Sequence, residues 1–129
     1  MSLTPNRDAV KSAAAEARQR HAAEIARDNA SGIGLRMAIE AAEAIVGGTA
    51  DMTDREIPVE VIWPQVSMAA AHALTAFLMT ISRGDAALAA SFLPGALASI
   101  QECALVRLRD GPEAFTQSFA EIQHPAGRA

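Results

Sequence analysis

The chain has 129 residues, a length that fits one domain. Alanine dominates its composition, with 30 alanines against 4 phenylalanines, 1 tryptophan and no tyrosine. The 11 basic and 15 acidic side chains give a net charge of −4, which excludes collagen-like and highly charged disordered chains. The same balance argues against a protein that binds nucleic acid through a strong positive electrostatic field. We therefore expect a single helical domain over residues 1–129 that does not bind nucleic acid.

The first predicted helix covers residues 5–29 and is indicated by Thr4 before Pro5, because proline suits the first position of a helix. Its apolar residues are nearly all alanine, and its charges are spread around the helix. Such a helix forms readily but buries little surface. We expect residues 1–30 either to dock loosely or to protrude as an N-terminal helix, as a solvated arm or half of an intermolecular contact.

A predicted interruption of the helix at residues 29–34 precedes a second predicted helix at 35–46, which ends at Gly47-Gly48. Residues 57–63 then combine β-branched side chains with proline, a composition that favours extended backbone. We predict that this segment lies extended along the bundle, because Pro58 removes one backbone donor from any β-ladder. Pairing of the segment with another molecule is the alternative.

An antiparallel helical hairpin is predicted over residues 65–109. Apolar residues recur every three or four positions up to Arg83, which predicts a central, well-buried helix. Gly84 ends this helix and Asp85 caps the next one, in which Pro94-Gly95 predicts a kink or a division into two helices. A last helix at 112–122 and a flexible tail at 123–129 complete an all-α bundle of four to five helices, with 65–122 as its core.

Two uncharged stretches of this hairpin bear on a membrane location. Residues 65–82 and 86–101 contain no Asp, Glu, Lys or Arg. A spanning helix needs roughly 20 strongly apolar residues, and both stretches are diluted by Ala, Ser and Thr, so we expect buried helices instead. The first residues lack the apolar core of a secretory signal, and a single cysteine excludes an intrachain disulfide. We expect a cytoplasmic protein, with a small membrane-associated helical hairpin as an alternative.

The reactive side chains do not form a predicted catalytic or metal site. In the register of the hairpin, His72 lies about 10 Å along the axis from the level of Cys103, which is too far for a catalytic pair. We expect Cys103 to be a small buried residue, and His72 to bond a carbonyl freed by Pro94. Single Glu-x-x-His and His-x-x-Glu spacings occur at 121–124 and 21–24, but a di-iron site needs two such motifs and two further glutamates. We expect no metal and no cofactor.

These observations favour a non-enzymatic interaction protein, a homo-oligomeric adaptor or regulator. We expect it to form a homodimer and to bind a further protein partner. The candidate partner-binding residues are Val59, Val61 and Trp63, because tryptophan is enriched at interface hot spots. Capping of one end of the bundle is the competing role for Trp63. The alternative function is a ligand-binding or enzymatic helical domain with a pocket near Pro94-Gly95, to which His72 and Thr75 contribute polar contacts.

Overall fold

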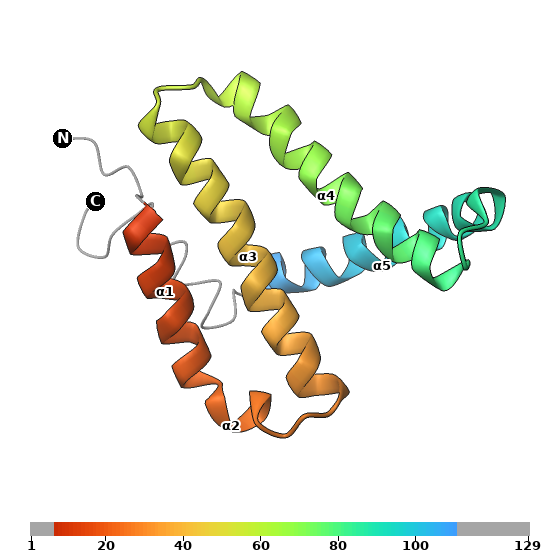
Figure 1. The fold of residues 1–129 in the computed structure, drawn as a ribbon, viewed down its shortest axis with the longest axis horizontal. Helices are drawn as coiled ribbons and strands as arrows, with labels where there is room; N and C mark the ends of the chain where they lie inside the picture. The colour runs from red at the N-terminus through yellow and green to blue at the C-terminus, as the bar shows by residue number, and fades with distance from the viewer. Residues whose placement is uncertain (1–6, 111–129) are drawn as a thin grey trace. The chain divides into compact units, whose positions relative to one another are not determined.

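The computed structural model describes residues 7–110, and its regular secondary structure in that range is entirely helical. Five helices follow one another along the chain: α1 (Arg7–Arg20), α2 (Ala22–Ile25), α3 (Ala30–Asp54), α4 (Val59–Ile81) and α5 (Ala86–Asp110) (Figure 1). The predicted all-α class is therefore confirmed. The helix predicted at 112–122 and the tail at 123–129 lie outside the described residues.

The described residues divide into two units, 7–62 and 63–110, where the sequence predicted one domain. The first unit holds α1, α2, α3 and the first turn of α4, and the second holds the rest of α4 with α5. Most of the buried apolar residues belong to the first unit, whereas the sequence placed the core at 65–122. The expected location of the core is therefore wrong.

α1 and α3 pack against each other in antiparallel directions (Figure 1). Two ion pairs record this direction: Arg7 lies 3.8 Å from Asp51, and Arg18 lies 2.8 Å from Glu43. The buried residues between the helices are mostly small: Val10, Ala13, Ala14, Ala17, Ile39 and Ala50. The prediction that the first helix buries little is wrong, because Val10, Ala13, Ala14 and Ala17 recur at spacings of three and four positions and form one buried stripe against α3.

α3 is longer at both ends than the predicted helix at 35–46. It begins at Ala30, where the side chain of Asn29 caps it by accepting a 2.9 Å hydrogen bond from the amide of Gly32. It continues through Gly47-Gly48 to Asp54, so the predicted helix end is wrong. A Cβ atom at Gly47 would collide with the guanidinium group of Arg7, and this glycine therefore marks the place where an α1 side chain crosses α3.

The extended segment predicted at 57–63 is wrong. Only Ile57 and Pro58 lie outside helices and turns in this stretch, and α4 begins at Val59. The carbonyl of Pro58 accepts hydrogen bonds from the amides of Val61 and Ile62 at 2.9 and 3.1 Å. Proline at the start of a helix loses no hydrogen bond, and the helix satisfies backbone groups that a lone strand would leave unpaired.

α4 and α5 form the predicted helical hairpin, in which a short turn joins two helices that contact each other only near it. Its turn contains Gly84 in the left-handed region at φ 85°, and the Gly84 amide donates to the carbonyl of Met79 at 2.9 Å. Asp85 then caps α5, because its Oδ1 accepts a 3.1 Å hydrogen bond from the amide of Leu88. α5 runs without interruption through Pro94, so the predicted division into two helices is wrong. One missing hydrogen bond does not end a helix whose other turns are rich in alanine.

Replacement of Gly32 tests the close approach of α2 to α3. We expect Gly32→Ala to lower the free energy of unfolding by about 1–3 kcal/mol, because its Cβ would collide with the backbone carbonyl oxygen of Glu24. The control is Gly34→Ala, which has no atom within 4 Å and gains up to about 1 kcal/mol of helix propensity. Thermal unfolding followed by circular dichroism measures both, and equal stability of the two variants would contradict this packing.

Candidate functional site: the apolar hairpin

The hairpin of α4 and α5 exposes most of its large apolar side chains. Trp63 is 72% exposed, Phe77 is 56% exposed and Leu108 is 82% exposed. The full set, called the apolar hairpin surface below, comprises Val59, Val61, Trp63, Met68, Phe77 and Ile81 on α4, and Leu88, Phe92, Leu93, Leu97, Ile100, Leu105, Val106 and Leu108 on α5. The prediction that the first hairpin helix is central and well buried is therefore wrong.

Apolar residues lie on all sides of both helices rather than along one stripe. Eighteen residues make five full turns, so Val59 and Phe77 lie on the same side of α4, and Met68, nine residues from each, lies on the opposite side. The same spacing of nine residues relates Leu88, Leu97 and Val106 on α5. A helix that is apolar all round normally lies in the core of a protein or in a membrane.

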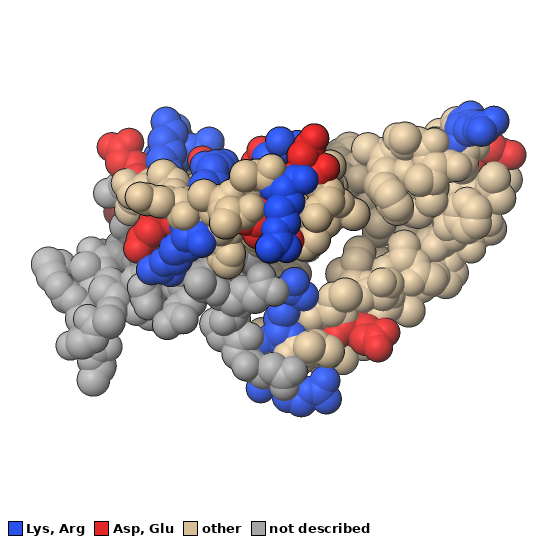
Figure 2. Space-filling view, turned by 90° about the horizontal axis from the view of Figure 1, so that it is seen from below, with Lys and Arg blue, Asp and Glu red and all other residues tan. Residues whose placement is uncertain are grey.

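Charged side chains are confined to the ends of the hairpin. The uncharged stretch of α4 extends from Val61 to Ser82, which is 22 residues, and that of α5 covers the 16 residues from Ala86 to Gln101. Figure 2 shows the hairpin as a broad uncharged surface with charged atoms at its tip, where the turn holds Arg83 and Asp85. The 65–82 stretch singled out in the sequence is thus only part of the uncharged run.

The two helices contact each other near their turn and diverge beyond it (Figure 1). Leu78, Ser82 and Ala89 are buried there. A small cavity of about 230 Å³ lies between the helices, lined by Thr75, Leu78, Met79, Ala86, Ala89, Ala90 and Leu93. Its lining is almost entirely apolar, so it offers few groups that would orient a polar ligand.

The residues proposed for a ligand pocket are not brought together. Thr75 lines the cavity between the helices, and Leu93, next to Pro94, lies on its other wall. His72 is exposed on α4 and is not part of that lining. Among residues 7–110 no hydrogen bond joins the side chain of His72 to α5, so the predicted bond from His72 to a carbonyl freed by Pro94 is wrong.

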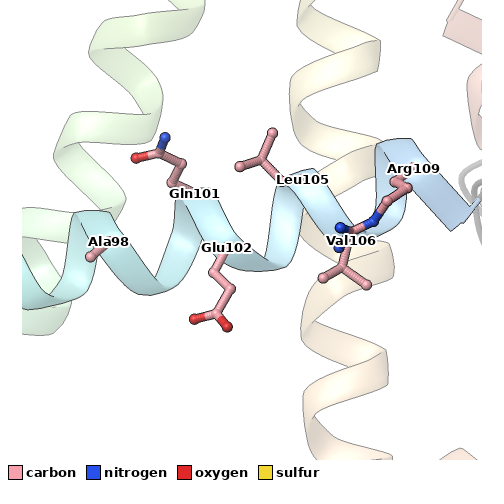
Figure 3. A pocket seen from close by; sticks show the side chains of 6 residues that line it. All are labelled: Ala98, Gln101, Glu102, Leu105, Val106 and Arg109. Carbon is pink, nitrogen blue, oxygen red and sulfur yellow. The ribbon is translucent and has the colours of Figure 1, made fainter.

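A second hollow, of about 300 Å³, lies along the end of α5 (Figure 3). All six lining residues belong to that one helix: Ala98, Gln101, Glu102, Leu105, Val106 and Arg109. In Figure 3 the side chains of Gln101 and Glu102 leave opposite sides of the helix and do not converge on one point. A hollow whose described lining comes from one helix does not fix the orientation of a ligand.

The three residues predicted to bind a partner are all on the surface. Val59 is 66% exposed, Val61 is 49% exposed and Trp63 is 72% exposed, which agrees better with an exposed anchor than with Trp63 as the cap of one end of the bundle. Sequence reasoning missed the rest of the apolar hairpin surface and assigned residues such as Phe77 and Ile100 to a core. The signal that identifies them is the lack of a polar face on either helix.

Cys103 is exposed, which contradicts the expected burial of this residue. Within residues 7–110, no three His, Cys, Asp or Glu side chains gather in an arrangement that would hold a metal ion.

Comparison with known proteins adds no functional information. Neither a protein family, nor a characterised protein, nor a solved structure matches the chain. The apolar hairpin surface is therefore the feature on which a function can be based.

The capping residue of α5 provides a test of the turn. We expect Asp85→Ala to weaken the first turn of α5 by about 1 kcal/mol, because the amide of Leu88 loses its acceptor. Asp85→Asn is the matched control, since asparagine caps a helix as well as aspartate does. Hydrogen exchange of the Leu88 amide measures the effect, and the expected result is faster exchange in the alanine variant alone. Equal exchange in both variants would argue against this cap.

Proposed function

We propose that this protein works by association, as an adaptor or regulator whose apolar hairpin surface is covered by another molecule. The observation that supports the proposal is the exposure of fourteen large apolar residues on α4 and α5. Burial of one such side chain contributes about 1.5–3 kcal/mol, so cover over even part of this surface stabilises a complex. Exposed apolar patches of this extent mark interaction sites.

A comparison of the two units of the chain strengthens this proposal. In the first unit, Val10 and Ile39 are fully buried, because α1 covers the apolar side of α3. In the hairpin, only Leu78 and Ala89 among the apolar residues of 63–110 fall into the buried class. The apolar surface of the first unit is thus covered by that unit's own helices, whereas most of the apolar surface of residues 63–110 is not covered within its own unit.

The first unit is suited to remain in water during this association. Its helices carry charges on their outer sides, including the exposed pairs Arg20–Glu16 and Arg27–Glu24. Figure 2 shows charged side chains of both signs across this part of the molecule, in contrast to the hairpin. In this arrangement the apolar hairpin attaches the protein to its partner. The packed, charged first unit stays in contact with solvent.

The proposal is tested by making the hairpin surface polar without disturbing packing. We expect the triple variant Leu97→Gln, Ile100→Gln and Leu108→Gln to lower association at least tenfold, because these side chains are 51%, 53% and 82% exposed and contribute through cover by a partner. The matched control is Met37→Gln on α3, where the side chain is 61% exposed. Sedimentation of the full chain prepared without detergent measures association.

Two results of that experiment would contradict the proposal. One is a wild-type chain that stays monomeric and soluble at all concentrations without any bound molecule. The other is a loss of association in Met37→Gln equal to that in the triple variant, since association would then not depend on the hairpin. Circular dichroism of each variant confirms that helix content is retained.

A further inference from the structure

We infer that the molecule covering the apolar hairpin surface is a lipid bilayer, which α4 and α5 cross as a helical hairpin. This inference rests on the proposed function and names the partner of that surface. Three observations carry it: the length of the helices, the distribution of apolar residues around them, and the placement of their polar groups.

α4 has the uncharged length that a bilayer requires, whereas the 16-residue uncharged run of α5 spans about 24 Å, so α5 crosses only with Glu102 close to one interface. The uncharged run from Val61 to Ser82 spans about 33 Å at 1.5 Å per residue, against a hydrocarbon core of about 30 Å. Both α4 and α5 pass the test of length and hydropathy for a membrane-crossing helix. A core helix of a soluble protein passes the same test when it is mostly buried, but here only 11% and 6% of the two apolar windows are buried.

The distribution of apolar residues favours lipid over a second protein copy. A partner helix covers one side of its neighbour, whereas lipid tails surround a helix on every side that protein leaves open. Met68 lies opposite Phe77 on α4, and Leu97 lies opposite Leu88 on α5, and all four side chains are exposed. A single partner on one side would leave half of these residues in water.

Several hydroxyl groups of the hairpin are already satisfied by its own backbone. Thr80 donates to the carbonyl of Ala76 at 2.7 Å, Ser91 donates to that of Leu88 at 2.6 Å, and Ser82 donates to that of Met79 at 3.3 Å. In lipid every polar group must find a partner within the protein, so these bonds reduce the cost of transferring the helices from water. The imidazole of His72, at the middle of the α4 run, has no such bond among the described residues and adds to that cost.

The ends of the hairpin carry the residues that membrane interfaces favour. Trp63 lies close to the start of the uncharged run, at the depth where tryptophan rings are enriched. The outer ends of the two helices are flanked by three arginines, Arg55, Arg107 and Arg109. The turn contains one arginine, Arg83. Because positive charges accumulate on the cytoplasmic side, the hairpin places both flanks on that side and its turn on the other.

Flotation with vesicles tests the inference on the full chain. We expect the protein to float with vesicles of phosphatidylcholine and phosphatidylglycerol and to remain bound in 1 M salt and in alkaline carbonate. Ala71→Arg places a charge at the middle of the uncharged run, and we expect about a hundredfold lower ratio of inserted to free protein. Ala41→Arg is the matched control, because it adds the same charge at an exposed alanine of α3. We expect this variant to float as the wild-type chain does.

The outcomes separate this inference from the proposed function. Flotation with the expected effect of Ala71→Arg supports both. A chain that stays out of the vesicle fraction as a defined soluble oligomer would overturn the bilayer and retain association. A soluble monomer would overturn both. Circular dichroism in detergent micelles shows whether the Ala71→Arg variant keeps its helices, so that misfolding is not mistaken for lost insertion.

Cysteine labelling tests the orientation. In a Cys103→Ser background, we expect Asp85→Cys in the turn to react with a membrane-impermeant maleimide on intact cells. Glu56→Cys, which precedes α4, should react only after the cells are opened, because its side of the membrane is inaccessible. Labelling of Glu56→Cys on intact cells would overturn the orientation, and so would an Asp85→Cys variant that reacts only after the cells are opened.

Discussion

The organisation of this protein depends on where its apolar side chains find cover. α1 and α3 cover each other, and their shared surface is made of side chains small enough to be fully enclosed, such as Ala14, Ala17 and Ala50. α4 and α5 meet only near their turn, around Leu78 and Ala89. Since apolar surface in water is costly, the second unit is complete only when something beyond its own two helices covers it.

Alanine acts differently in the two units because of its neighbours. In α1 it alternates with arginine, lysine and glutamate, so its stripe faces α3 while the charges face water. In α4 and α5 it is mixed with leucine, phenylalanine and methionine, without a charged side. The same abundant residue therefore forms a close helix contact in one unit and part of an all-round apolar surface in the other.

Local structure was predicted well where a hydrogen-bond partner lies a few residues away in the chain. The turn at Gly84 and the cap at Asp85 depend on hydrogen bonds within four or five residues, and both are present. The extended segment at 57–63 and the helix end at Gly47 were wrong, because residue preference for these states is weak beside the hydrogen bonds of a continuing helix. Exposure of Cys103 was beyond local reasoning, and for Trp63 the sequence left an exposed anchor and a bundle cap both open, since burial depends on which helices approach each other.

The sequence by itself determined the helical class, the hairpin and its turn, because helix periodicity, glycine and a capping aspartate act over a few residues. It also contained the uncharged run of residues 61–82, which fits both a buried core helix and a membrane-spanning helix. Only the tertiary structure decided that the buried core lies between α1 and α3 and that the hairpin is exposed. The physical reason is that burial belongs to pairs of surfaces, and a pattern of apolar residues does not say which surface, within the chain or outside it, will cover them.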